Sequence, residues 1–363
     1  MIEKRPISFS VIGLVLGNDG KKIYRWYKEA LSGFTTPEEQ VKLHENDFVQ
    51  EKVDSRTGEI PTLAVPILKS ENFGDHMTID DKNIGGEGYT IIANKNTGKI
   101  AVLAQTTKSE ILADILQKIP VSIRYAVKII SKDLAEGYDW IARSMFLNAI
   151  RVDDKFHVLK LGFEALQNVR VRYRQIVLTE ERKKREEKKA LERELKAACK
   201  ERGKVWKKRK EAITKPKTYN NGDTTKELLA RSRYLLFSLR EKWTPSQQER
   251  AEILFREFPE IKKAYDLMIQ FRSFYQTKIG DTAAAKERLK DWYGEVGTSN
   301  IDEMETFAST VAHHESTIMN YFETGQTNAF AESLNSQIQR FVQSNQGAND
   351  RDFFHFRLKG YFS

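Results

Sequence analysis

One glutamate stands apart in the segment TNAFAESLNSQI, residues 327–338. Apolar residues recur there at helical spacing and predict a buried stripe formed by Phe330, Leu334, Ile338 and Phe341. Glu332, Asn335 and Gln339 then share a different face of the same helix. No basic residue lies four positions before or after Glu332. An acid without a basic neighbour on a polar helix face is a candidate ligand for a cation.

Two aspartates follow segments that read as strands. Asp80 closes the run MTID, and Asp133 closes KIISKD. Functional groups in open α/β sheets lie outside the carboxyl ends of the strands, and neighbouring parallel strands bring those ends together. Two aspartates and a glutamate offer the oxygen ligands that Mg²⁺ prefers. The three acids therefore predict a metal site suited to two-metal phosphodiester chemistry.

Each acid taken alone also has a structural interpretation. Asp80 can cap a turn, and Asp133 can be the N-cap of the helix that follows it. The combination with the isolated Glu332 favours a shared site over two separate caps. His313 and His314 are predicted to be surface residues of a helix rather than ligands, since no carboxylate stands at metal-binding spacing from them.

The elements that would position these acids alternate between strand and helix patterns over residues 75–158. Their order is strand, hairpin, helix, strand, helix and strand, with Ser109 as a candidate N-cap of the first helix. In sequence they are HMTID (76–80), YTIIANKNTGKIAVLAQ (89–105), KSEILADILQKI (108–119), RYAVKIISKD (124–133), AEGYDWIARSMF (135–146) and AIRVDDKFHVLKL (149–161). This order indicates an α/β fold with a mixed sheet flanked by helices.

The rest of the chain reads differently. Residues 1–45 are predicted to be helical, and residues 46–70 lack periodicity and are interpreted as a linker. From about residue 166 to 310 every pattern is helical, and residues 302–363 are helical again. We therefore expect four parts, which are a helical and possible DNA-binding region (1–70), the first part of the catalytic core (71–170), a helical, basic insertion (171–310) and the part carrying Glu332 (311–363).

Composition excludes several classes of protein. The chain has 363 residues, of which 40% are apolar and 31% charged, so it is globular rather than disordered. It contains no run of eighteen apolar residues, and its first twenty residues do not resemble a signal peptide. Cys199 is the only cysteine, which excludes an internal disulfide and a cysteine-based zinc cluster. A soluble, cytoplasmic protein is expected.

Positive charge is concentrated in one segment. Residues 181–210 contain 15 Lys and Arg against six Glu, a net charge of +9 that equals the formal net charge of the whole chain. Such a segment is typical of a protein that binds a polyanion, most often nucleic acid. A solvated helix with Glu–Lys pairs four residues apart is the alternative.

The linked motifs are similar to those of a known family. IRVDDKFHVLKL, NGDTTKELLARSRYLLF, ERAEILFREFPEIKKAY and TNAFAESLNSQI, in this order, resemble the transposases of ISL3-family insertion sequences. The likeness runs from about residue 75 to the C-terminus. It implies an RNase H-like catalytic core of the DDE type, interrupted by a helical insertion domain.

The resemblance implies roles for individual residues. Asp80, Asp133 and Glu332 would be the catalytic acids and would bind two Mg²⁺ or Mn²⁺ ions, with Asn335 one turn after the glutamate. Asp154 is a rival to Asp133 as second aspartate; otherwise Asp154 and His157 would support the site or bind DNA. Strand order favours Asp133, because the fourth strand of this fold lies beside the first. A buried core histidine is the alternative for His157.

The resemblance also implies partners. Double-stranded DNA, as terminal inverted repeats and target, would be bound by a homo-oligomer of a bacterial, nucleoid-associated protein, in which the basic insertion would reach the catalytic face. Trp206 can stack on an unpaired base or pack against a helix. The candidate DNA-binding residues are Lys183, Lys184, Arg185, Lys188, Lys189, Trp206, Lys207, Lys208, Arg209, Lys210, Arg340 and Arg357.

The chain also departs from the family pattern. Gln337, Gln339 and the turn at 347–350 stand where basic residues are usual, and Asp81 replaces a glutamate. Phosphate contacts would then come from the basic insertion, and recognition of the DNA ends from the insertion or a helper protein. The expected activity is cleavage at the terminal repeats followed by strand transfer. The alternatives are a nuclease without strand transfer and a DNA-binding protein that has lost catalysis.

Overall fold

The computed structural model describes residues 7–34, 48–50, 62–202, 218–345 and 350–362. The chain divides into two compact units. The sheet unit comprises residues 1–157 and 314–363, and the helical unit comprises residues 158–313. In the described part of the chain, no helix combines the length and the apolar character needed to cross a membrane.

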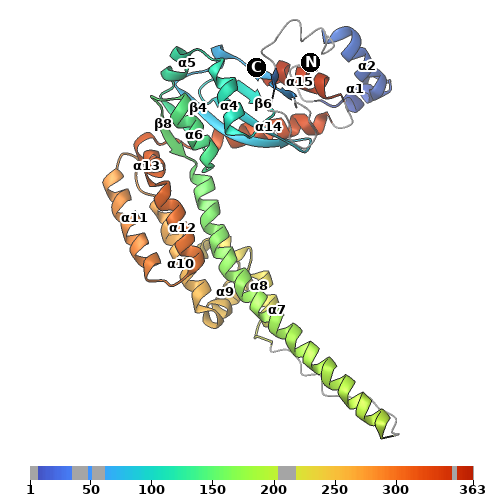
Figure 1. Ribbon diagram of the computed structural model, residues 1–363, viewed down its shortest axis with the longest axis vertical. Helices are drawn as coiled ribbons and strands as arrows, with labels where there is room; N and C mark the ends of the chain where they lie inside the picture. The colour runs from blue at the N-terminus through green and yellow to red at the C-terminus, as the bar shows by residue number, and fades with distance from the viewer. Residues whose placement is uncertain (1–6, 35–47, 51–61, 203–217, 346–349, 363) are drawn as a thin grey trace. The chain divides into compact units, whose positions relative to one another are not determined.

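A six-stranded mixed sheet forms the centre of the sheet unit (Figure 1). Its strand order is β3-β6-β5-β4-β7-β8, in which β5 is antiparallel to β4 and β6, while β4, β7 and β8 are parallel. The strands are β3 (Ile67–Leu68), β4 (His76–Ile84), β5 (Glu87–Asn94), β6 (Ile100–Ala104), β7 (Ile129–Lys132) and β8 (Ile150–Asp153). The predicted mixed α/β sheet is confirmed, and β7 lies beside β4 with β8 further out.

Helices cover both faces of this sheet. One face packs on α4 (Ser109–Gln117) and α6 (Glu136–Met145), and α5 (Val121–Ala126) precedes β7. The other face packs on α14 (Ala329–Ser344) and α15 (Arg351–Phe362). Leu334, Ile338 and Phe341 of α14 are buried against the sheet as predicted, and Phe330 is partly buried. The polar side of α14, with Glu332, is therefore fixed in orientation by its apolar stripe.

Several local predictions were wrong. β4 runs four residues past Asp80, because the strand continues as one arm of a hairpin with β5. Ser109 is the first residue of α4, and the N-cap position, Lys108, makes no side-chain capping bond. Residues 124–126 belong to α5 rather than to a strand. The region read as a linker holds three strands of two or three residues each, too short to show periodicity, namely β1 (Phe48–Gln50), β2 (Thr62–Ala64) and β3.

The N-terminal region is helical where it is described. It consists of α1 (Phe9–Leu16), α2 (Gly20–Trp26) and a π-helical turn, η1 (Tyr27–Leu31). Phe9, Ile23 and Tyr27 pack with Phe353 of α15 in a small aromatic core. The first and last described segments of the sheet unit are therefore joined by apolar contacts.

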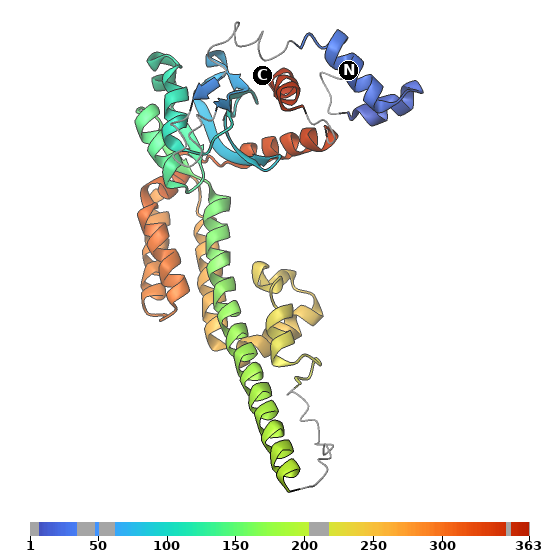
Figure 2. The same ribbon diagram turned by 45° about the vertical axis from the view of Figure 1, so that its right-hand side comes forward.

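The helical unit contains no strand among its described residues 158–202 and 218–313. Its long helix, green in Figure 2, is α7 (Lys155–Glu201), whose first turn still belongs to the sheet unit. The others are α8 (Thr225–Arg231), α9 (Pro245–Glu257), α10 (Pro259–Phe274), α11 (Thr282–Gly297) and α12 (Asp302–His313), and α13 (Glu315–Thr324) follows in the sheet unit. Trp292 of α11 is fully buried, and its Nε1 donates to the Leu267 carbonyl of α10 at 3.0 Å.

A buried histidine makes the stability of the sheet unit depend on pH. His355 of α15 lies with Nε2 2.7 Å from the Tyr89 hydroxyl of β5. Burial, and then the nearby positive charge of Arg351, lower the pKa of His355 to about 4, compared with about 6.5 in an unfolded chain. Because the unfolded chain binds the proton first, this stabilisation is complete above pH 6.5 and is lost as the pH falls toward 4.

We expect the free energy of unfolding to fall by about 2 kcal/mol between pH 7 and pH 5 through His355 alone. His355→Gln should remove that part of the decrease, as measured by urea denaturation at the two pH values. The exposed His313 provides a control, since His313→Gln should keep the whole decrease. An unchanged pH dependence in His355→Gln would contradict the prediction.

Candidate active site

The strand register places three aspartates at one level of the sheet. Thr78 of β4 pairs with Ser131 of β7, and Lys132 of β7 pairs with Asp153 of β8. Continued along the strands, the same registers align Asp80, Asp133 and Asp154. Side chains at one level of neighbouring parallel strands point to the same face of the sheet. The three aspartates therefore lie side by side where β7 and β8 end.

Asp80 faces the helix that carries Glu332. It pairs with Ile91, whose side chain belongs to the core under α14. Its Oδ2 accepts a hydrogen bond from Nδ2 of Asn335 at 2.8 Å, and its Oδ1 accepts one from the Asp81 N–H at 2.9 Å. Burial raises the pKa of Asp80 to about 6, and the charges of Asp81 and Asp133 also raise it. A cation bound at Asp80 would favour its charged form.

Asp133 immediately follows β7 and is half-buried. Its Oδ1 accepts a hydrogen bond from the Ala135 N–H at 2.8 Å in the turn that leads into α6. The interpretation of Asp133 as the N-cap of the helix that follows is therefore wrong, because the N-cap of α6 is Ala135. Burial raises the pKa of Asp133, and Asp81 raises it further. Its Oδ2 accepts no hydrogen bond from the described residues, so it is free to bind a cation.

Asp154, the rival to Asp133, already has several partners. It is 2% exposed, and its Oδ1 accepts from the N–H groups of Phe156 and Asn328, both at 3.3 Å. Its Oδ2 lies 2.9 Å from Nδ1 of His157, in the first turn of α7. The bond to Asp154 raises the pKa of His157, and the charges of Asp133 and Asp80 add to that effect. These contacts favour Asp154 and His157 as supporting residues.

Glu332 lies in the first turn of α14 with Oε1 buried and without a hydrogen-bond partner. Burial raises the pKa of Glu332, and the charge of Asp154 raises it further. Among the described residues, the ligand atoms of Asp80, Asp133 and Glu332 do not all lie within 4.8 Å of one another. A shared cation site would therefore require side-chain movement, although the backbone already brings the two aspartates to one level.

The chemistry of this group fits a hard divalent cation. Asp80, Asp133 and Glu332 all have raised pKa values, and the unpaired Oε1 of Glu332 lacks any compensating donor. Buried oxygens without donors are stabilised by a positive charge, and carboxylate oxygens are the ligands that Mg²⁺ and Mn²⁺ prefer. The donor set therefore suits the predicted metal.

Behind these aspartates lies a buried ionic cluster that the sequence did not reveal. Lys132 of β7 is fully buried, with Nζ 2.5 Å from Oδ1 of Asp153 and 3.2 Å from Oδ1 of Asp139 of α6. Asp153 also accepts a hydrogen bond from the hydroxyl of Thr317 of α13. Lys132 and Asp153 directly precede Asp133 and Asp154, so this cluster fixes the ends of both strands.

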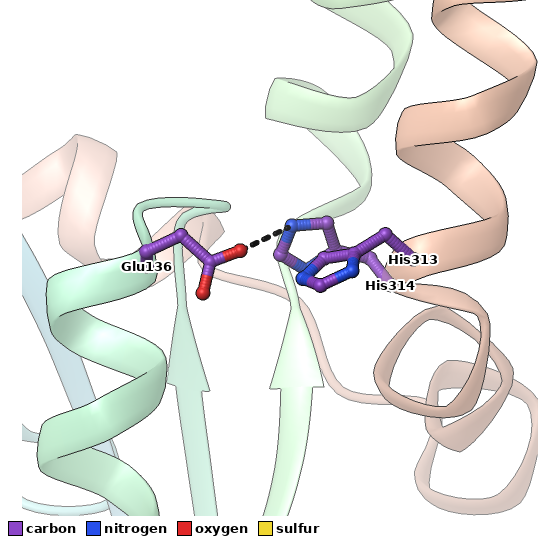
Figure 3. Close-up of side chains that lie close together, drawn as sticks. All are labelled: Glu136, His313 and His314. Atoms are coloured by element: carbon purple, nitrogen blue, oxygen red, sulfur yellow. Dashed lines mark ion pairs between the residues drawn. The ribbon is translucent and has the colours of Figure 1, made fainter.

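A second group of possible ligands lies near α6 (Figure 3). Glu136, His313 and His314 offer ligand atoms that all lie within 4.8 Å of one another. Within the sheet unit, Nε2 of His314 lies 3.9 Å from Oε1 of Glu136, and its Nδ1 lies 3.1 Å from Oδ2 of Asp153. The prediction of a surface position was therefore wrong for His314, which is buried between two carboxylates. His313, the last residue of the helical unit, is exposed as predicted.

The candidate DNA-binding residues lie in different environments. The side chains of Lys183, Lys184, Arg185, Lys188 and Lys189 are exposed on α7. Arg340 is exposed on α14, where its Nε donates to the Ser336 carbonyl at 3.4 Å. The predictions for Trp206, Lys207, Lys208, Arg209 and Lys210 lie outside the described residues.

Arg357 is buried instead. Its guanidinium lies over the rings of Phe9 and Phe341, at 4.7 and 5.5 Å from the ring centres, and donates to Oδ1 of Asn345. This is the environment of a packing residue, and the DNA contact predicted for Arg357 is not favoured by it.

A comparison with protein-family models matches residues 77–358 of the chain to the transposase family DDE_Tnp_ISL3. The matched range begins within β4, ends within α15 and includes the whole helical unit. Comparisons with curated proteins and with solved structures gave no match. The family match thus covers most of the chain, including all the acids described above.

Proposed function

Because the chain belongs to the ISL3 family of transposases, we propose that it cuts the terminal inverted repeats of an insertion sequence and joins the freed 3′ ends to target DNA. The observation that carries this proposal is the alignment of Asp80 with Asp133 across parallel strands, next to the helix of Glu332. Both steps would be in-line displacements at phosphorus, first by water and then by the 3′-hydroxyl.

Asp80, Asp133 and Glu332 would hold two Mg²⁺ or Mn²⁺ ions. Such ions, when bound, lower the pKa of the attacking oxygen and stabilise charge on the leaving one. Asn335 would hold Asp80 in place through the bond at 2.8 Å. His157, paired with Asp154, would place a positive charge beside the carboxylates and reduce their mutual repulsion.

Double-stranded DNA would be the substrate. The protein would act on it as a homo-oligomer, with or without a helper protein. The exposed lysines and arginines of α7 are supported as phosphate contacts by their exposure and by the positive charge of the segment. Residues 181–201 of α7 contain nine Lys and Arg against six Glu. Much of the net charge of +9 of the segment 181–210 therefore lies at residues 202–210.

Replacement of Lys183, Lys184, Arg185, Lys188 and Lys189 by glutamine should weaken DNA binding without regard to sequence. Each side chain that binds a phosphate in the wild type contributes about 0.9 to the slope of log affinity against log salt, so its replacement should reduce that slope accordingly. Gel-shift titrations at several salt concentrations measure this slope. The exposed Lys286 and Lys290 of α11 provide a control, and their replacement should leave the slope unchanged. Equal slopes for the α7 variant and the wild type would remove α7 from the DNA interface.

Product analysis tests the proposed function. The purified protein, the labelled terminal repeats of its own element, a target plasmid and Mg²⁺ should give cut ends and joined products. Cut ends without joined products would instead indicate a nuclease without strand transfer. Binding without cutting would indicate a DNA-binding protein that has lost catalysis.

A further inference from the structure

Asn328 occupies the N-cap position of α14 but does not cap the helix. Its backbone has φ −89° and ψ 14°, and its side chain accepts no hydrogen bond from the first turn. Asparagine is favoured at N-caps because its side-chain oxygen satisfies a free backbone N–H. Asn328 is fully buried and forgoes this bond, so capping does not explain the residue.

The amide group of Asn328 has no partner. Neither Oδ1 nor Nδ2 makes a hydrogen bond, and both atoms are enclosed. Buried polar groups without partners destabilise a fold, and most native ones have a partner or a functional reason. The buried amide of Asn328 therefore requires a ligand, a bound water or a functional reason to explain it.

The backbone of Asn328 connects two acids of the candidate site. Its N–H donates to Oδ1 of Asp154 at 3.3 Å, and its carbonyl accepts from the N–H of Glu332 at 3.2 Å. Side chains at positions i and i+4 of a helix are neighbours, and Oε1 of Glu332 is also buried and unpaired. Asn328, the N-cap of α14, and Glu332, in its first turn, thus share the same deficit, an amide and a carboxylate oxygen without hydrogen-bond partners.

We propose that Asn328 is a positioning residue of the cation site, and that its amide gains hydrogen-bond partners from Glu332 and from water bound to a divalent cation. This inference rests on the proposed function. The unpaired amide would lower the stability of the cation-free protein. The same amide would increase the affinity of the protein for the cation. Residues that hold the ligands of a metal typically contribute 10- to 100-fold to metal affinity.

The two effects have opposite signs, which separates this role from a structural one. Asn328→Leu replaces the amide with an apolar group of similar size. In the absence of divalent cations its Tm should rise by several degrees, while its affinity for Mn²⁺ should fall at least tenfold. Asn345, near the end of the same helix, provides a matched control. It is buried, and its Nδ2 donates to the Phe341 carbonyl at 2.7 Å, so Asn345→Leu should lower the Tm and leave Mn²⁺ affinity unchanged.

Thermal denaturation with EDTA and titration calorimetry with Mn²⁺ alone provide the two measurements. A lowered Tm or a failure to fold in Asn328→Leu, repeated in Asn328→Ala, would mean that the amide is satisfied within the fold and would overturn the inference. Wild-type Mn²⁺ affinity in Asn328→Leu would also overturn it while leaving the proposed function intact. No Mn²⁺ binding by the wild-type protein would overturn the proposed function and this inference together.

Discussion

Replacing Asp80 by asparagine is expected to reduce DNA cleavage by roughly 10³-fold or more, because a cation at this site would lose one of its ligands. Metal ions contribute several kcal/mol of transition-state stabilisation, and each 1.4 kcal/mol corresponds to about a factor of ten in rate. Asp80 is buried beside Asp133 and its pKa is raised to about 6. A neutral residue there relieves repulsion, so the variant should fold and bind DNA as the wild type does.

Asp81 is a matched control for Asp80. It is the next residue of β4, it is exposed, and its backbone N–H rather than its carboxylate contacts Asp80. Asp81→Asn should change the cleavage rate by no more than about fivefold, as expected for an exposed charge worth less than 1 kcal/mol. Single-turnover cleavage and gel-shift affinity should be measured on both variants. Equal losses in the two would show that general negative charge, rather than ligation by Asp80, matters here.

Replacing Lys132 by methionine is expected to lower the free energy of unfolding of the sheet unit by about 3–5 kcal/mol, since it leaves the buried carboxylate of Asp153 without its lysine. Lys132 and Asp153 are both fully buried, and Asp139 is nearly so. Native-state hydrogen exchange of peptides from β4, β7 and β8 would measure the change in this unit alone. Cleavage should also fall, because the ends of β7 and β8 carry Asp133 and Asp154.

Two variants control for the loss of Lys132. Lys128 precedes β7 and pairs with Asp75 at 2.7 Å, but both side chains are exposed, so Lys128→Met should cost less than about 1 kcal/mol. Adding Asp153→Asn to Lys132→Met removes one uncompensated charge and should restore part of the stability. Equal stability of Lys132→Met and Lys128→Met would contradict the role of the buried ionic cluster in fixing the ends of β7 and β8.

Much of the sheet could be predicted from local patterns. Two runs of β-forming residues around a Lys-Asn-Thr-Gly turn marked β5 and β6, and the stripe of Leu334, Ile338 and Phe341 marked the buried side of α14. The continuation of β4 past Asp80 could not be predicted in the same way. Its second half alternates only weakly, and its length depends on pairing with β5 through the Gly85–Gly86 turn.

The candidate site was less completely predictable, for a physical reason. Asp80, Asp133 and Asp154 align because the β4–β7 and β7–β8 registers agree, and registers of parallel strands are contacts between residues far apart in the sequence. Lys132 lies in a segment with a strand pattern, and that pattern does not predict which acids form ion pairs with the lysine. The unpaired amide of Asn328 can be found only once burial is known, although its position four residues before Glu332 was a usable signal.

Cleavage of labelled terminal-repeat DNA by wild-type protein and Glu332→Gln, with Mg²⁺, Mn²⁺ or EDTA, tests the catalytic assignment most directly. Glutamine keeps the shape of the side chain and removes its charge. We predict nicking at the repeat boundary that requires the metal, is lost in Glu332→Gln, and is accompanied by equal DNA affinity in the two proteins. Metal-dependent nicking that persists in Glu332→Gln, or nicking that continues in EDTA, would contradict the assignment of Asp80, Asp133 and Glu332 as the catalytic acids.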